Sequence, residues 1–333
     1  MKASKSHLTG LFEKFNALTI LIIGDVMIDS YYWGKVDRIS PEAPVPIVSV
    51  EKKESRLGGA ANVALNIKAM GSTPILCSVI GTDDDGKELI ALTKENGQSV
   101  NGLMQSSTRR TTKKTRIIGN NHQMLRIDGE DLHPLTESEE TSFYERIHEI
   151  INAQKVDAII FEDYDKGSIT ASLIKKVVSL ANEKAIPTTV DPKKNNFTEY
   201  HHVTLFKPNL KELKEGLKLD FNHKNQEELE DAIKKLENTL HNKNTLITLS
   251  ELGVFITSPK AKHHIKAHHR DITDVSGAGD TVISVATLCL ALNQEPEMIA
   301  ELSNLAGGLV CENVGVMPVD KSELLKEAIR LFT

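Results

Sequence analysis

The 333-residue chain has few cysteines, few aromatic residues and no long apolar run. Cys77, Cys289 and Cys311 are scattered and show neither a CxxC pair nor zinc-ligand spacing, which argues against a disulfide framework and a zinc site. The chain does not open on a charged segment followed by an apolar stretch, and no stretch approaches transmembrane length. These absences predict a cytoplasmic protein without a signal peptide or membrane span.

The chain also has no excess of positive charge, and its formal net charge is −6. This balance argues against nucleic acid or an anionic membrane as the main partner. Any anionic ligand therefore needs a local cluster of basic residues. Hydrophobic residues make up 40% of the chain, which is enough for the core of an ordinary globular protein.

Short aliphatic runs alternate with stretches of helical length over most of the chain. Strands that alternate with such helices favour right-handed βαβ units. The expected fold class is therefore α/β, a doubly wound and mostly parallel sheet with helices on both faces. We expect strands at 18–24, 75–80, 156–161, 188–190 and 246–249, and helices at 59–70, 136–152, 169–183, 226–240, 281–292, 295–311 and 321–331.

Two segments interrupt this alternation. Residues 31–56 are rich in proline and lack a helical period, and residues 108–128 alternate around a turn at Gly119-Asn120-Asn121. We expect both to form antiparallel strands of a small lid over one end of the main sheet. Because no linker or repeat is visible, residues 1–333 are predicted to form one domain with this lid.

Residues 274–280, Asp-Val-Ser-Gly-Ala-Gly-Asp, stand directly before an apolar helical run. Small residues there let the amides of Gly277, Ala278 and Gly279 converge on an anion at a helix N-terminus. Asp280 follows in the first turn, where a carboxylate can take the proton of a hydroxyl that attacks a phosphoryl group. No Lys-Ser/Thr pair follows, so the stretch is not a Walker loop. Taken alone, it is equally consistent with an ordinary helix start.

Two further motifs accompany it, Gly58-Gly59-Ala60-Ala61-Asn62 and Asn209-Leu210-Lys211-Glu212. With these three motifs the chain resembles the ribokinase-like, pfkB-type carbohydrate kinases over essentially its whole length. The resemblance implies an ATP- and Mg²⁺-dependent kinase with Asp280 as catalytic base and the amides of residues 277–279 as an anion hole. It leaves dependence on a monovalent cation open. It also implies that the nucleotide lies near Asn209, Glu212, Ser250, Gly253 and Asp274, with Glu212 holding Mg²⁺ through water.

The two segments expected near the nucleotide also have a purely structural interpretation. Asn209 and Glu212 have the spacing of a capping box at a helix start, and that role is compatible with a second one at the nucleotide. Ser250 and Gly253 fit an ordinary hairpin turn equally well.

Acidic and small residues near the first strand are candidates for sugar binding. Asp25 and Asp29 follow the strand at its carboxyl end, where α/β sheets bind ligands. Gly58 and Gly59 permit close backbone approach, and Asn62 offers both a donor and an acceptor. Each of these residues also has an ordinary role available in a turn or a helix start.

Within the family, three segments point to one subgroup. Residues 24–29 (Gly-Asp-Val-Met-Ile-Asp), 38–46 (Arg-Ile-Ser-Pro-Glu-Ala-Pro-Val-Pro) and 163–167 (Asp-Tyr-Asp-Lys-Gly) look like those of the D-glycero-D-manno-heptose 7-phosphate kinases. This resemblance implies phosphorylation at C1, on the route to ADP-heptose and the lipopolysaccharide core, with Asp163 and Lys166 near the substrate. Glu162 departs from it, because the subgroup commonly has a serine there. A kinase for another sugar and a catalytically silent ligand-binding relative remain open.

The lid sequence supplies basic residues for a phosphorylated sugar. Five cations fall between Arg109 and Arg116, and in a strand Lys114 and Arg116 point to the same face. Arginine suits this task because its planar fork pairs with phosphate oxygens. A solvated lid surface is the alternative. The candidates for the substrate phosphate are Arg38, Lys114, Arg116, Arg126 and Lys166.

Three further expectations concern metals, chain length and assembly. His263, His264, His268 and His269 lack partners at metal-site spacing, so no metal is expected there.

The chain ends at Thr333, shortly after the catalytic motif, so we expect no nucleotidylyltransferase domain and assign adenylyl transfer to another polypeptide. The exposed strands of the lid favour a homodimer formed through it.

Overall fold

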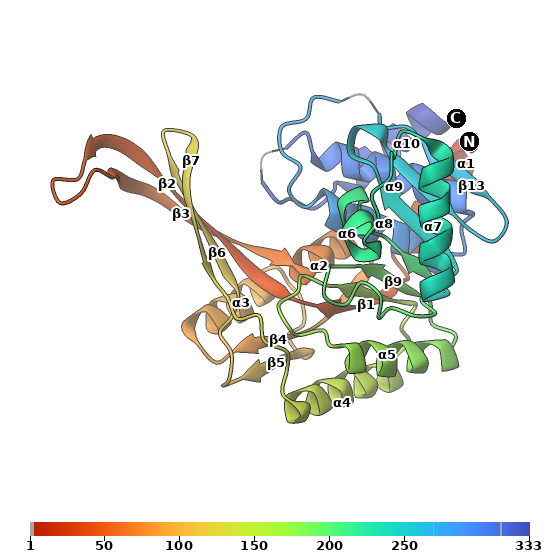
Figure 1. The fold of residues 1–333 in the computed structure, drawn as a ribbon, viewed down its shortest axis with the longest axis horizontal. Coiled ribbons are helices and arrows are strands. Elements are labelled where there is room, and N and C mark those ends of the chain that lie inside the picture. Colours follow the sequence, from red (N-terminus) through yellow and green to blue (C-terminus); the bar gives the residue numbers. More distant parts are fainter. Residues whose placement is uncertain (1–2, 269, 314) are drawn as a thin grey trace.

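A nine-stranded sheet forms the body of the protein, and a four-stranded ribbon extends from one side of it (Figure 1). The computed structural model describes residues 3–268, 270–313 and 315–333, so His269 and Val314 lie outside the described residues. The strand order of the main sheet is β13-β12-β11-β10-β9-β8-β1-β4-β5. Its strands are β1 (Thr19–Gly24), β4 (Thr73–Gly81), β5 (Leu103–Ser106), β8 (Ala158–Glu162), β9 (Thr188–Asp191), β10 (Leu205–Phe206), β11 (Asn244–Thr248), β12 (Val254–Thr257) and β13 (Lys262–Ile265).

Neighbouring strands from β5 to β11 are parallel, and only β12 and β13 join antiparallel at one edge. In register, Leu21 of β1 pairs with Ile75 on one side and with Ile159 on the other. The aliphatic runs form parallel strands because both faces of the sheet are covered, so that nearly every side chain is buried. The expected α/β, mostly parallel fold is confirmed.

Alternation along β1 divides the core into two layers. Ile20 and Ile22 pack on one face, while Leu21 and Ile23 pack on the other, and all four are 0% exposed. One layer is covered by α1 (Lys5–Phe15), α2 (Ala60–Ala69), α8 (Ala278–Ala291), α9 (Pro296–Val310) and α10 (Lys321–Phe332). The other is covered by α4 (Glu137–Ala153), α5 (Ala171–Glu183), α6 (Leu210–Leu217) and α7 (Gln226–Leu240).

Helix α8 is buried along most of its length because it packs against α2, α9 and the sheet. Every residue from Asp280 to Cys289 is buried, which explains the continuous apolar run in its sequence. The helix begins at Ala278, three residues before the predicted start, so Asp280 lies in its first turn. Helix packing therefore holds the catalytic motif against the sheet.

The lid is a separate sheet with the order β3-β2-β6-β7. Asn120 and Asn121 both have positive φ, and they form the turn expected between its last two strands. The pairs β2–β3 and β6–β7 are antiparallel as expected, but β2 pairs with β6 in parallel because the two belong to different hairpins. The strands are β2 (Val26–Ile39), β3 (Pro46–Gly59), β6 (Lys113–Gly119) and β7 (His122–Gly129), and α3 (Asp84–Glu95) contacts the base of this sheet.

In the part of the chain that the structure describes, no helix combines the length and the apolar character needed to cross a membrane.

Candidate active site

The carboxyl ends of the parallel strands bring a group of charged side chains together. Asp25 directly follows β1, Glu162 ends β8, Asp191 ends β9, and Lys207 directly follows β10. All four are buried, with exposed fractions between 0% and 4%. Because parallel strands end at a common edge, residues far apart in sequence become neighbours there, as expected for a ligand site in such a sheet.

Asp280 faces this group from the first turn of α8. Its carboxylate accepts hydrogen bonds from Asn62 Nδ2 at 2.6 Å and from the Tyr164 hydroxyl at 2.9 Å. Burial raises the pKa of Asp280 to about 6, although the hydrogen bond from Asn62 acts in the opposite direction. A carboxylate with that pKa is ionised near neutral pH and is a better proton acceptor than an ordinary aspartate.

Three of the carboxylates form a compact cluster. One oxygen each of Glu162, Asp191 and Asp280 lies within 4.8 Å of the others. Lys207 Nζ lies 2.8 Å from Asp191 Oδ2 and offsets part of this negative charge. Burial, followed by the charges of Asp191 and Asp280, raises the pKa of Glu162 well above its usual value.

The start of α8 has the backbone geometry of an anion site. Gly277 is the N-cap with φ 80°, a conformation that L side chains rarely adopt, and a Cβ there would lie 3.1 Å from Asn62 Nδ2. The amides of Gly277 and Gly279 donate no hydrogen bond to another described residue, whereas Ala278 N donates to Val275 O at 3.3 Å. Free amides and the helix dipole together favour an anion beside Asp280.

Asp274 stabilises the loop that leads to this helix. Its carboxylate accepts hydrogen bonds from Ser276 N and Gly315 N, each at 2.9 Å. Asp274 therefore joins the motif to the segment after α9, and the structure places it at the loop rather than among the buried carboxylates.

Asn209 and Glu212 form the capping box that their spacing suggests. Asn209 Oδ1 accepts from Glu212 N, and Glu212 Oε2 accepts from Asn209 N, both at 2.8 Å. The other oxygen of Glu212 pairs with Lys193 Nζ at 2.7 Å. Lys193 lies in turn 5.1 Å from the ring centroid of Tyr164. The box thus connects the start of α6 to the carboxylate cluster.

Ser250 and Gly253 lie in the turn between β11 and β12, which is a short 3₁₀ helix, Ser250–Leu252. Both residues have positive φ, 54° and 87°, so the hairpin-turn interpretation of this segment is correct. Thr248, at the end of β11, bridges to Asn209. The turn therefore lies on the same side of the sheet as the capping box.

Asp25 and Asp163 are both engaged by the protein itself. Asp25 accepts from the amides of Tyr164, Lys166 and Ser168 at 2.9–3.1 Å. Asp163 accepts from the Tyr200 hydroxyl at 2.7 Å and from Asn196 Nδ2 at 2.9 Å. These bonds fold the loop after β8 over the end of β1, and this loop places the Tyr164 hydroxyl at Asp280.

The lid contributes a second charged group around Asp29. Arg116 Nη1 donates to Asp29 Oδ1 at 2.5 Å, and a Cβ at Gly58 would lie only 2.1 Å from Asp29 Oδ2. The Arg116 guanidinium also lies over the Tyr31 ring, 5.2 Å from its centroid. Gly58 is thus required for the close contact between β3 and Asp29, as the sequence predicts for a glycine at a close approach.

Lys114 is half-buried and has no ion pair or hydrogen bond among the described residues. Its ammonium group lies 5.7 Å from the centroid of the Tyr164 ring. Burial, and then the nearby charge of Lys166, lowers the pKa of Lys114. A bound anion would relieve this unfavourable environment.

Of the remaining basic candidates, Lys166 lies near Lys114 and Arg126 lies opposite Arg116 in register, whereas Arg38 is remote. Arg38 is exposed, and it lies nine residues further along β2 than Asp29, roughly 30 Å away in an extended strand. Arg126 is exposed and paired with Asp128 at 2.9 Å, whereas Lys166 pairs with Glu130 at 2.9 Å.

Several residues at the site were not among the predicted site residues. Tyr164 belongs to the segment 163–167 already compared with the family. Asp191 ends the buried strand β9 and Lys193 follows it, which is a usable signal. Lys207 follows a strand of only two residues, Leu205–Phe206, too short to be recognised from hydrophobic pattern.

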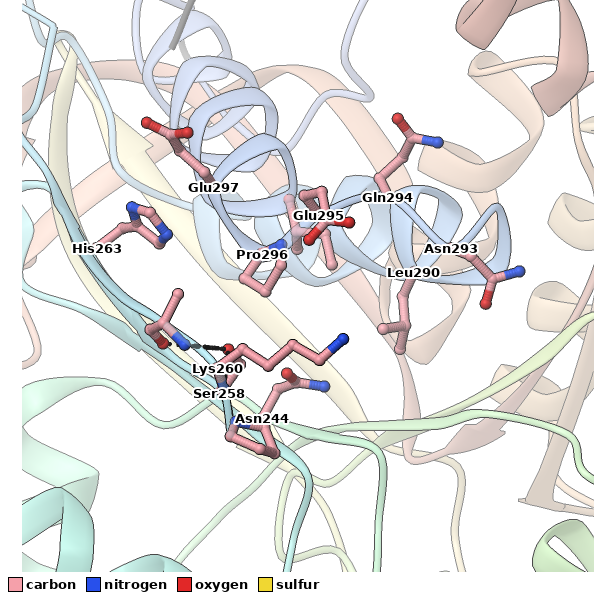
Figure 2. A pocket seen from close by; sticks show the side chains of 13 residues that line it. Asn244, Ser258, Lys260, His263, Leu290, Asn293, Gln294, Glu295, Pro296 and Glu297 are labelled. Atoms are coloured by element: carbon pink, nitrogen blue, oxygen red, sulfur yellow. Dashed lines mark hydrogen bonds between the residues drawn. The ribbon is translucent and has the colours of Figure 1, made fainter.

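A separate cavity of about 440 Å³ lies at the opposite edge of the sheet. Asn244, which lines it, begins β11, whereas the carboxylates follow the ends of the parallel strands. Figure 2 shows Lys260 and Asn244 facing Pro296 and Leu290 across this space. None of the predicted site residues lines it, so we place the active site at the carboxylate cluster, on chemistry rather than on cavity size.

Known proteins of similar sequence identify the family of the chain. A family model described as "pfkB family carbohydrate kinase" matches residues 17–322. A protein from Citrifermentans bemidjiense called "Bifunctional protein HldE" is 36% identical over 97% of the chain, and one of the same name from Helicobacter pylori is 38% identical over 89%. The chain spans only 66% and 63% of the lengths of these two relatives.

Two solved structures share the fold at low identity. Phosphofructokinase-2 from Escherichia coli, in complex with potassium, has a TM-score of 0.77 at 17% identity and covers 93% of this chain and 97% of its own. Ribokinase from Arabidopsis thaliana, complexed with ribose and ATP, has a TM-score of 0.70 at 16% identity and covers 93% and 98%. The extent of the family match and the identity to the curated relatives show that the chain belongs to the pfkB family of carbohydrate kinases, enzymes that act as phosphotransferases.

Proposed function

We propose that the chain transfers the γ-phosphoryl group of ATP to the C1 hydroxyl of D-glycero-D-manno-heptose 7-phosphate, which forms the 1,7-bisphosphate for ADP-heptose and lipopolysaccharide core synthesis. The observation that carries the proposal is the buried Asp280, hydrogen-bonded by Asn62 and Tyr164 at the start of α8. The heptose assignment is supported by the segments around Asp29 and Arg38 and by relatives named as bifunctional HldE proteins.

Asp280 takes the proton of the attacking hydroxyl. Its two hydrogen bonds fix the orientation of the carboxylate, and its pKa of about 6 leaves it ionised near pH 7. Asn62 Oδ1 is buried and has no partner among the described residues, so it is available to accept a hydrogen bond from the sugar. The amides of Gly277, Ala278 and Gly279 then stabilise the charge of the moving phosphoryl group.

The nucleotide side is built from α6 and the end of β11. Asn209, Ser250 and Gly253 line the approach to the phosphates. Glu212 has an oxygen-only donor set that fits Mg²⁺, and its existing bonds to Lys193 and Asn209 favour contact through water. Mg²⁺ neutralises charge on the phosphates when it is bound.

The lid binds the far end of the sugar. Lys114 lies opposite Asp29 in register, Arg116 pairs with Asp29, and Lys114 lacks an anionic partner among the described residues. We assign them to the 7-phosphate, whereas Asp29 and the Gly58-Gly59 backbone contact sugar hydroxyls. Arg126 lies opposite Arg116 in the register of β6 and β7, where its exposed guanidinium pairs with Asp128. Arg38 lies too far along the lid to reach the same site, and in a homodimer formed through the lid it would serve the partner subunit instead.

An ADP-release assay across a sugar panel tests the proposal. The expected result is turnover with heptose 7-phosphate and at least about tenfold less with unphosphorylated heptose, because the charge-assisted bonds to the 7-phosphate are lost. Turnover with ribose or fructose 6-phosphate, but not with the heptose phosphate, would reject the substrate while retaining the kinase.

A second measurement separates the enzyme from a silent ligand-binding relative. Asp280→Asn should lower kcat by about 10²–10⁴-fold, because the general base is lost while the anion hole remains. Circular dichroism should show unchanged secondary structure. Equal turnover in the wild type and Asp280→Asn would contradict the role of Asp280, and no turnover in either with any sugar would favour the silent relative.

A further inference from the structure

Glu162 occupies an energetically unfavourable position beside Asp280. Its side chain is 0% exposed, and neither carboxylate oxygen has a hydrogen-bond partner among the described residues. It nevertheless lies within 4.8 Å of the ligand oxygens of Asp191 and Asp280. An unpaired, ionised carboxylate buried beside two others costs on the order of several kcal/mol, so Glu162 is either protonated or compensated by a positive group.

The neighbouring lysines do not supply all of that compensation. Lys207 pairs with Asp191 at 2.8 Å, and Lys193 pairs with Glu212 at 2.7 Å. A divalent cation bound between the three carboxylates would favour the ionised form of Glu162 despite its burial. Together with Lys207, it would balance the charge of Glu162, Asp191 and Asp280.

The ligand atoms also indicate the class of cation. All three are carboxylate oxygens, which hard cations such as Mg²⁺, Mn²⁺ and Ca²⁺ prefer. Two oxygens on one Ca²⁺ lie at most about 5 Å apart, and on one Mg²⁺ at most about 4.2 Å. Oxygens that all lie within 4.8 Å of one another are therefore close enough to share one such ion.

We propose that Glu162, Asp191 and Asp280 form a divalent-cation site that fills before the nucleotide binds. It differs from the contact of Glu212 with Mg²⁺ described above, because it uses direct carboxylate ligands at the ends of β8 and β9. The site does not depend on which sugar is phosphorylated, and its test requires no turnover.

Asp280 has the capacity for this second contact. An ionised carboxylate has about four acceptor positions. Asn62 and Tyr164 occupy one on each oxygen, which leaves one position on each. One of these binds the cation, and the other remains for the hydroxyl of the substrate.

Mn²⁺ binding to the nucleotide-free protein tests the proposal, with free Mn²⁺ measured by electron paramagnetic resonance. The wild type should bind one Mn²⁺ that Mg²⁺ displaces. Glu162→Gln keeps the shape of the side chain but removes a ligand charge, and it should weaken this binding about tenfold or more, since even outer-shell changes have effects of that size. Glu237→Gln is the matched control, because the Glu237 carboxylate contacts the Thr245 and Thr257 hydroxyls and not the cluster, and it should bind Mn²⁺ as the wild type does.

Thermal unfolding gives an independent measurement. Mn²⁺ should raise the Tm of the wild type and of Glu237→Gln but not that of Glu162→Gln. If Glu162→Gln does not fold, Glu162→Ser serves as the second variant, with the same expected loss. Absence of Mn²⁺ binding in the nucleotide-free wild type, or undiminished binding in the Glu162 variants, would overturn the proposal and identify Glu162 as a protonated acid instead.

Discussion

At the residue scale, the environment of Asp280 determines the pH at which its carboxylate is ionised. Burial is the largest influence and raises its pKa to about 6, while the donors Asn62 and Tyr164 limit the rise. Because the raised value belongs to the folded enzyme, the active ionised form is lost as the pH falls through about 6. The acid limb of the pH–rate profile should therefore lie near that value.

Tyr164→Phe tests this assignment. Removing the hydroxyl removes a hydrogen bond that favours ionised Asp280, so the acid limb should move upward by roughly half a unit to one unit. The measurement is kcat/KM against pH with a saturating nucleotide concentration.

Tyr200→Phe is the matched control for that shift. The Tyr200 hydroxyl donates to Asp163 at 2.7 Å and makes no hydrogen bond to Asp280. Its acid limb should coincide with that of the wild type. An unmoved limb in Tyr164→Phe, or the same shift in both variants, would contradict Asp280 as the titrating base.

At the element scale, the start of α8 depends on the backbone conformation of Gly277. Gly277→Ala should destabilise the fold by about 1–2 kcal/mol, because alanine is disfavoured at φ 80°. Its Cβ would also lie 3.1 Å from Asn62 Nδ2, so kcat should fall together with stability. Urea unfolding and steady-state kinetics measure the two effects.

Gly10→Ala provides the opposite case within the same chain. Gly10 lies inside α1, and an added Cβ meets no atom within 4 Å. This variant should gain roughly 0.5–1 kcal/mol, since alanine is the better helix former, and keep its kcat. An equal loss of stability in both variants would show that positive φ is not the reason why Gly277→Ala is destabilised.

The elements that the sequence predicts best are those buried on one or two faces. The helix predicted at 226–240 matches α7, Gln226–Leu240, because its apolar residues repeat at helical spacing. The sequence predicts that the first lid strand starts near residue 31, whereas β2 begins at Val26. Strands β1 and β2 follow each other almost directly, and only Asp25 separates them. Strand β10, with two residues, carries too little pattern to be detected.

Part of the site was also predictable from short stretches of sequence. Asp280, Asn62 and Gly277 belong to motifs that can be recognised without knowledge of the fold, and the structure brings all three into contact. The proximity of Glu162 to Asp191 depends on β8 and β9 being neighbours in the sheet, which is a property of strand order. Local spacing in one sequence contains no information on that order, so the carboxylate cluster is visible only in three dimensions.

At the scale of the whole molecule, the lid carries several exposed apolar side chains. Val45, Leu125 and Ile127 are 51–56% exposed, on strands or turns that extend away from the body (Figure 1). Such a surface on an extended ribbon favours contact with a second copy. We expect a homodimer formed through the lid.

Leu125→Asp should convert that dimer into a monomer, because a charge would be buried in the interface. Sedimentation velocity measures the change. Leu331→Asp is the control, since Leu331 is 37% exposed on α10, and it should leave the dimer intact. A wild-type monomer, or dissociation by both variants, would contradict the lid interface.

The length of β2 has a mechanical consequence. This strand begins one residue after Asp25, passes Asp29, and ends at Ile39 near the tip of the ribbon. One strand therefore joins the proposed sugar site to the tip. We expect a small rotation of the backbone at Asp29 to shift the ten residues that follow, so that sugar binding at the proposed site changes the position of the tip.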